Sequence, residues 1–256
     1  MDDFDALLTQ ELDRWHAAGR IADFWLRDDD AVEPTASLDR LLETTADFGI
    51  PLTLAVIPAL TGEALARRLE QEPHCTVAVH GWAHVNHAGM TEKKQELGRH
   101  RPAPEVLEQL RQGLVRLDEL NPGRFAPVLV PPWNRIDADL VPQLGSLGYR
   151  ALSVYGPEKP AELPLINTHV DVIDWHGTRG GRDALALAGE TITRLRRMFE
   201  HGGAMGLLTH HLVHDAAVDD FLRRLFTITA TQPACRWRPV MDILTDMDAA
   251  RTDAAG

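Results

Sequence analysis

Short apolar runs alternate with amphipathic stretches along almost the whole chain, and this alternation restricts the fold more than any other feature. The runs are the length of typical strands and too short for buried helices. Strands that alternate with helices pair in parallel through right-handed crossover connections. The pattern predicts seven strands, at residues 22–26, 52–57, 75–79, 125–130, 149–154, 170–173 and 204–208.

The stretches between these strands carry helix signals. Thr35 is a suitable N-terminal cap for a helix that Gly49 ends, and Gly148 ends another. Seven or eight strand–helix units in a chain of this length predict an α/β fold, a closed or nearly closed (β/α) barrel. The helices are expected at residues 4–17, 35–48, 62–71, 104–120, 137–147, 183–200, 215–226 and 240–249.

Nothing in the sequence marks a second domain. The chain has no internal repeat, low-complexity tract or linker, and its 256 residues suit one large domain. The proline-rich stretch from Gly156 to Pro164 is interpreted as an inserted loop. We therefore predict a single domain over residues 1–256.

The charge balance and the cysteine content exclude several classes of protein. With 38 acidic and 26 basic residues the net charge is −12, so a nucleic-acid partner is not expected. Two distant cysteines, Cys75 and Cys235, suit a reducing compartment. The acidic start Met1–Asp5 is unlike a signal peptide, and no apolar run approaches the ~20 residues of a membrane span. We predict a cytoplasmic protein with a small-molecule or saccharide substrate, and the oligomeric state stays open.

Polar side chains of the kinds that catalyse reactions or bind metal ions follow five of the predicted strands. The carboxyl ends of parallel barrel strands meet at one face, which is where the active sites of such folds lie. Clusters that are far apart in the sequence are therefore expected to converge in space. These clusters are Asp28–Asp30, His80, Trp133, Asp174 and His210.

The histidines give the most specific signal. His80 and His84 are four residues apart, so one helical turn would point both imidazoles the same way. With one carboxylate they make a three-ligand metal site that keeps positions open for water. Each cluster alone also has a structural interpretation: a solvated acidic loop, a core tryptophan or a satisfied strand end. The adjacent pair His210 and His211 is the hardest to explain in that way.

The order of these motifs resembles the polysaccharide deacetylase (NodB-homology) superfamily. The chain reads Asp-Asp, His-x-x-x-His, Pro-Pro-Trp, Asp-Trp and Leu-x-His in the family's order, over residues 22–212. The resemblance implies a distorted (β/α)7-type barrel. It also implies a metal-dependent hydrolase that removes acyl groups from amines, typically N-acetyl groups from sugars.

The resemblance assigns roles residue by residue. It implies Asp29 as catalytic base, with Asp30, His80 and His84 as metal ligands; a register one residue earlier, Asp28 and Asp29, stays open. The other implied roles are His210 as general acid, Trp133 and Pro132 at the acyl pocket, and Asp174 as an orienting carboxylate.

One position departs from the family pattern. An arginine that holds the base usually stands two residues before the proline matched by Pro132, where this chain has Val130. Arg27 and Arg135 are the candidates to replace it. The departure puts the sugar substrate in doubt more than the metal site.

We therefore expect one divalent ion, Zn²⁺ from the His and carboxylate donors, and hydrolysis of a non-peptide C–N bond. The expected substrate is a cytoplasmic sugar or sugar-linked intermediate. Two alternatives remain: a catalytically silent metal- or carbohydrate-binding module, and a metal-dependent phosphoesterase, which would assemble two or three ions with more ligands.

Overall fold

The structure is a computed structural model that describes residues 3–255. Met1 and Asp2, at the start of the acidic N-terminal segment, and Gly256 lie outside the described residues. The elements group into two compact units, each assembled from several stretches of the chain. Unit 1 takes its residues from 1–28, 35–52 and 168–239, and unit 2 from 29–34, 53–167 and 240–256.

Unit 1 is built on four parallel strands. Strand β1 (Ala22–Ala31) pairs with β7 (Ala204–Thr209) from Asp23 to Asp28, and with β8 (Cys235–Trp237) over its first residues. The short strand β6 (Val170–Asp171) lies on the other side of β7. The last three residues of β1 belong to unit 2.

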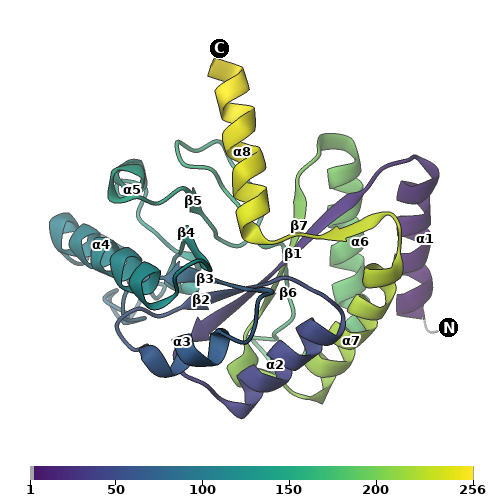
Figure 1. Ribbon diagram of the computed structural model, residues 1–256, viewed down its shortest axis with the longest axis horizontal. Helices are drawn as coiled ribbons and strands as arrows, with labels where there is room; N and C mark the ends of the chain where they lie inside the picture. The colour runs from purple at the N-terminus through teal and green to yellow at the C-terminus, as the bar shows by residue number, and fades with distance from the viewer. Residues whose placement is uncertain (1–2, 256) are drawn as a thin grey trace. The chain divides into compact units, whose positions relative to one another are not determined.

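Helices cover the sheet of unit 1, and aromatic pairs hold them together. Phe4 meets Phe221 edge to face, with ring centroids 5.6 Å apart, and Trp15 meets Phe199 at 5.1 Å. Figure 1 shows the resulting arrangement, in which α1 lies beside α6 and α7. The helical segments are α1 (Asp3–Ala17), α2 (Ala36–Asp47), α6 (Ala184–His201), the 3-10 turn η2 (His211–Val213) and α7 (Ala216–Thr231).

Unit 2 continues with the parallel strands β2 (Leu52–Val56), β3 (Cys75–His80), β4 (Phe125–Val130) and β5 (Ala151–Leu152), hydrogen-bonded in that order. All five residues of β2 are buried, so its side chains are removed from water on both faces of the sheet. This explains why these strands are continuous apolar runs in the sequence rather than alternating ones.

The helices of unit 2 pack closely on these strands. The Tyr149 hydroxyl donates to the carbonyl of Leu110 at 2.9 Å, and a Cβ atom at Gly113 would stand only 3.0 Å from Pro58. A larger residue at 113 would therefore need Pro58 to move by a few tenths of an ångström. The helical segments are α3 (Glu63–Leu69), α4 (Ala103–Leu120), the 3-10 turn η1 (Pro132–Asn134), α5 (Val141–Leu147) and α8 (Val240–Ala255).

All seven predicted strands are present, but some bounds differ. The acidic triplet Asp28–Asp30 was expected after the first strand, and it lies inside β1. The strand continues because Asp28 keeps its place beside Thr209 in the β7 ladder, and its carboxylate has its own partner in His211. The β8 strand was not predicted, because Cys235–Trp237 is only three residues long and lacks an apolar run.

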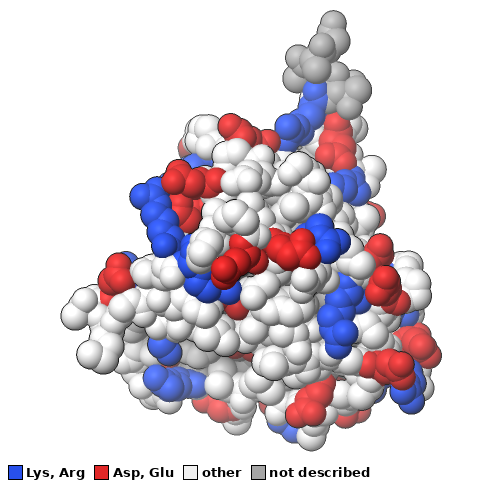
Figure 2. All heavy atoms as spheres, turned by 90° about the vertical axis from the view of Figure 1, so that its left-hand side faces the viewer, with Lys and Arg blue, Asp and Glu red and all other residues white. Residues whose placement is uncertain are grey.

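Two surface properties bear on the expected partners. No helix among the described residues combines the length and apolar character that a membrane crossing requires. Figure 2 shows acidic and basic side chains interspersed on the face that it presents. The net negative charge therefore does not form one continuous acidic field on that face.

The cap of α7 gives a stability prediction. The Asp215 carboxylate accepts hydrogen bonds from the N–H groups of Ala217, Val218 and Gly181, so it joins α7 to the loop after β6. The bonds from Val218 and Gly181 are the main reason that the pKa of Asp215 lies below its ordinary value. Asp215→Ala is expected to lower the free energy of unfolding by about 1 kcal/mol at pH 7, as typical caps do.

Because the folded carboxyl has the lowered pKa, its contribution is complete above the ordinary value and is lost as pH falls through the lowered one. The difference between wild type and Asp215→Ala should therefore shrink between pH 5 and pH 3 in urea titrations. Asp220→Ala is the control, because Asp220 is exposed on the same helix and only approaches Arg224 at 3.7 Å. An equal loss in Asp220→Ala would contradict the capping role.

Candidate metal centre

Three ligand-type side chains of unit 2 meet at the ends of β1 and β3. Asp30 Oδ1 lies 3.1 Å from His80 Nε2 and 3.3 Å from His84 Nε2. One potential ligand atom from each of the three lies within 4.8 Å of the other two, and no other such group of His, Cys, Asp and Glu occurs in residues 3–255. The predicted triad therefore comes together in space, from positions 50 residues apart in the chain.

The surroundings of His80 set which ring nitrogen faces the carboxylate. His80 Nδ1 lies 3.0 Å from the carbonyl oxygen of Val130, and a carbonyl only accepts hydrogen bonds. Nδ1 therefore carries the proton, and in the neutral ring Nε2 presents its lone pair to Asp30. A lone pair and a carboxylate oxygen 3.1 Å apart fit a bound cation.

A buried glutamate holds the turn that presents His84. The Glu96 carboxylate, 1% exposed, accepts from the N–H groups of Trp82 at 3.0 Å and Ala83 at 2.8 Å. Glycine is required at residue 81, because a Cβ atom there would lie 2.2 Å from Glu96 Oε2 and the φ angle is +58°. Sequence reasoning did not find Glu96, although an acidic residue among the basic ones of 93–101 is a weak signal for it.

The aromatic wall comes from the turn after β4. The Trp133 ring lies 4.4 Å from the His84 ring, and the Lys94 ammonium lies 5.8 Å from the centre of the indole. Trp133, which was predicted at the acyl pocket, thus lies beside the candidate ligand His84. Pro132 is buried, and its ring packs against Gly81 below the turn.

Three residues of this site have strained backbone conformations. Asp30, His84 and Trp133 have φ angles of +71°, +57° and +55°, in the left-handed region that favours glycine. Each such residue costs on the order of 1–3 kcal/mol and persists only where the surroundings impose it. Side chains held in this way at one place are typical of a functional site rather than of a solvated loop.

Burial affects the protonation of the candidate ligand His84. Burial lowers the pKa of His84 below its ordinary value, and the neighbouring His80 lowers it further, whereas Asp30 acts in the opposite direction. The imidazole of His84 is therefore neutral at neutral pH, which is the form that binds metal ions.

The geometry favours one register of the acidic triplet. Asp28 is fully buried, and its carboxylate accepts from the N–H of His211 at 2.7 Å and pairs with Nδ1 of His211 at 2.5 Å. Asp30 is the residue that meets the two histidines. Asp29, 2% exposed, stands between these two in the chain.

The remaining predicted site residues lie in unit 1. The His210 ring meets the Trp175 ring edge to face at 4.7 Å, and Trp175 Nε1 donates to Asp171 at 2.9 Å. The Asp174 carboxylate accepts from the N–H groups of Gly177 and Thr178 in its own loop. Asp171, not Asp174, is thus the carboxylate joined to His210 through an intervening ring, and sequence reasoning did not single it out.

Val130 stands where the family has an arginine, and here its main chain rather than its side chain contributes to the site. The Val130 carbonyl accepts from His80 and from the N–H of Gly81. Arg135, one candidate replacement, donates to the carbonyl of Lys94 at 2.9 Å and does not hold Asp29. Arg27, the other candidate, is fully buried in β1.

No protein-family model matches the chain, and no curated protein matches it significantly. Solved structures do match it. A candidate polysaccharide deacetylase from Mycobacterium smegmatis is similar with a TM-score of 0.70 at 16% identity, over 91% of this chain and 92% of that one. A family 4 carbohydrate esterase from Streptomyces lividans, in complex with acetate, matches with 0.55 at 16% identity, over 84% and 90%.

A third similar structure is a mutant of a pseudoenzyme of the same esterase family, CE4, with a TM-score of 0.57 at 15% identity. That match covers 88% of this chain and 67% of the other. Identities this low establish the fold. The chain has the α/β fold of the polysaccharide deacetylases, a distorted (β/α) barrel, as its motif order predicted.

Proposed function

We propose that the protein is a metal-dependent hydrolase that removes an acyl group, typically acetyl, from an amine. The observation that carries this proposal is the triad of Asp30, His80 and His84, with His80 oriented by a main-chain carbonyl and His84 by the turn that Glu96 holds. This set of donors lies in a chain with the fold of polysaccharide deacetylases. Zn²⁺ is the ion that two imidazoles and one carboxylate fit best.

A divalent ion at this site polarises a carbonyl oxygen and makes water acidic enough to attack at neutral pH. In the proposal Asp29, adjacent to the ligand Asp30, takes the proton from the attacking water. A backbone N–H beside Trp133 faces the developing oxyanion. His210 donates a proton to the leaving amine, and the edge-to-face contact with Trp175 fixes its ring. Each proton transfer contributes on the order of 10²–10⁴ in rate.

We further propose a sugar or sugar-linked substrate in the cytoplasm. In its support, one similar structure is a carbohydrate esterase holding acetate, and both cysteines of this chain are free thiols. A silent binding module remains the second candidate, because a similar structure is a pseudoenzyme and Val130 replaces the family arginine. A phosphoesterase with several ions is disfavoured, because the described residues offer one three-ligand group.

Metal content provides the first test. Wild-type protein is expected to hold one divalent ion per chain, and His80→Ala, His84→Ala and Asp30→Asn are each expected to lose it, as measured by elemental analysis. His87→Ala is the matched control, because His87 is a histidine of the same loop that lies outside the triad, and its backbone N–H donates to the carbonyl of Gln95. Full occupancy in both His80→Ala and His84→Ala would move the site elsewhere.

Substitution at the base separates catalysis from silent binding. Asp29→Asn is expected to keep the metal and to lose acetate release from N-acetylated amines by two orders of magnitude or more, because the water then loses its proton acceptor. Wild-type protein that binds one ion but releases no acetate from a broad N-acetylated panel would favour the silent module. Metal loss in Asp29→Asn, with an active Asp30→Asn, would instead shift the register to Asp28 and Asp29.

The general acid is tested with two leaving groups. His210→Ala should cut turnover by orders of magnitude on an amide, whose amine must be protonated to leave, but far less on an ester with a good leaving group. Metal content should not change. His211→Ala is the neighbouring comparison, and because His211 is 1% exposed and bonded to Asp28, it should mainly lower stability. Equal losses on amide and ester in His210→Ala would contradict its role.

A further inference from the structure

A cavity of about 540 Å³ opens in unit 2, and two of its lining residues, Asn134 and Arg135, directly follow Trp133 in the chain. This volume is within the range of small-molecule sites. Its walls come from three loops that follow neighbouring strands: the loop after β3, the turn after β4, and the segment after β5 that includes part of the proline-rich stretch. Parallel strands place these loops at their carboxyl ends, where ligands bind in such folds.

Main-chain hydrogen bonds join the segments that form the walls of the cavity. On one side the N–H of Asp137 donates to the carbonyl of Leu97 at 2.8 Å, which fixes the loop after β3 against the turn after β4. On the other side Leu152 bonds to Pro164 at 2.9 Å and to Ile166 at 3.0 Å. The cavity is therefore part of the backbone framework and does not depend on the rotamer of one side chain.

Apolar side chains and two cations line the cavity. The apolar lining comes from Ile136, Val141, Leu152, Val154 and Leu165. Lys93 and Arg135 also line the cavity. The chain has only three lysines, and two of them are the adjacent Lys93 and Lys94. Cations concentrated beside one cavity are unusual in a chain of net charge −12.

These cations have no carboxylate partner within the described residues. Arg135 makes one hydrogen bond, to the carbonyl of Lys94, which leaves most of its N–H groups for another acceptor. Lys93 forms no ion pair in the part of the chain that the structure describes. The one acidic lining residue, Glu92, already accepts from the N–H of Gly89 at 2.9 Å and from His100 at 3.1 Å.

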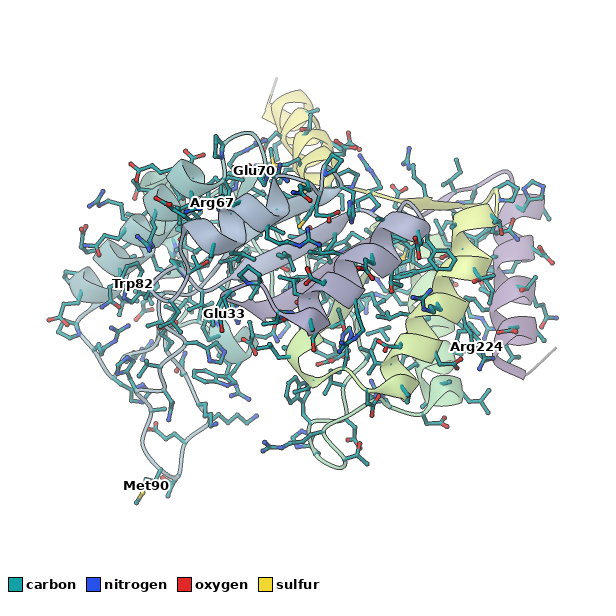
Figure 3. All side chains as sticks on the ribbon, turned by 60° about the horizontal axis from the view of Figure 1, so that its bottom comes forward. Glu33, Arg67, Glu70, Trp82, Met90 and Arg224 are labelled. Carbon is teal, nitrogen blue, oxygen red and sulfur yellow. The ribbon has the colours of Figure 1, made fainter. Side chains whose placement is uncertain are left out.

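Lining residues of the cavity are chain neighbours of the residues at the wall of the metal centre. Asn134 and Arg135 follow Trp133 directly, and Lys93 precedes Lys94, whose ammonium faces the Trp133 ring. Figure 3 shows that the loop after β3 extends from Trp82 at its base to Met90 at its tip, outside the body of the strands. The metal centre and the cavity therefore share the loop after β3 and the turn after β4.

We infer that the cavity binds the non-reacting part of the substrate, an apolar group that bears an anionic carboxylate or phosphate. The inference rests on the proposed deacylation and gives it a substrate class: an N-acylated amphipathic anion. The apolar body occupies the surface around Leu152 and Leu165, and the anion meets Arg135 and Lys93.

Direct binding tests the cavity without any turnover. Octanoate, octyl phosphate, 1-octanol and acetate are titrated into the metal-containing protein by calorimetry. At least one of the two eight-carbon anions is expected to bind at least tenfold more tightly than both octanol and acetate, and the tighter one identifies the source of the anionic group. Octanol binding as tight as that of both anions, or acetate binding as tight as that of octanoate, would overturn the inference.

Variants locate the bound anion. Lys93→Met and Arg135→Met should each weaken binding of the preferred anion about fivefold to tenfold and leave octanol unaffected. Arg67→Met is the matched control, because Arg67 is an exposed cation of the same unit that pairs only with Glu63 on α3 (Figure 3). Asp30→Asn should keep the affinity. If its affinity disappears, the anion was bound at the metal centre, and the inference is wrong.

Turnover separates this inference from the proposed function. N-acetyl-L-phenylalanine and N-acetylphenethylamine differ only by a carboxylate, and kcat/KM for acetate release should be at least tenfold higher for the first. Arg135→Met should remove that preference. Equal hydrolysis of the two compounds would overturn the cavity's role in substrate selection. If neither is hydrolysed while octanoate binding behaves as expected, the deacylation proposal fails and the anion site stands.

Discussion

The approach of the Asp30 carboxylate to the Nε2 atoms of His80 and His84 is the interaction on which the candidate site depends. With His80 neutral this approach is unfavourable by itself, because Nε2 then presents a lone pair to an anion and because Asp30 and His84 both have left-handed φ angles. The fold offsets this cost with buried hydrogen bonds. Glu96 holds three N–H groups of the His84 turn, and the Val130 carbonyl fixes the ring of His80. Part of the folding free energy thus offsets the close approach of the ligand atoms, and a bound cation would make that arrangement favourable.

A second buried polar pair orders unit 1. Asp28 and His211 are 0% and 1% exposed, and removing either partner would leave the other without its main hydrogen bonds. The pair joins the end of β1 to the turn after β7. Each member of the pair is the chain neighbour of a predicted catalytic residue: Asp29 follows Asp28, and His210 precedes His211. The pair therefore fixes the backbone next to both predicted catalytic residues. The triplet of aspartates and the pair of histidines thus combine positioning residues with candidate catalytic ones, which explains why neither motif contains only one residue of its kind.

Most of the fold and the core of the candidate site follow from the sequence, whereas the supporting residues do not. The strands were recognisable because buried parallel strands are continuous apolar runs, and Asp30, His80 and His84 because they stand at strand ends with ligand spacing. Glu96 and Asp171 were not found, because their roles arise from bonds to backbone or to an indole N–H that no local pattern specifies. The same reason explains β1: a strand continuing through three aspartates contradicts strand propensity, and only the distant partners of those carboxylates make it stable.

The residue at the place of the family arginine and a cation of the cavity lie five residues apart, at the end of β4 and in the turn that follows it. At residue 130 the structure needs only a carbonyl, which orients His80, so an apolar side chain fits the strand interior. Five residues later, Arg135 lines the cavity and extends the cationic surface that Lys93 and Lys94 begin. A guanidinium that does not hold the base carboxylate can bind a substrate anion instead. The substitution at Val130 therefore does not require loss of activity. It is consistent with the proposed deacylation of a sugar-linked substrate that carries an apolar anionic group, which Arg135 binds in the inferred cavity site.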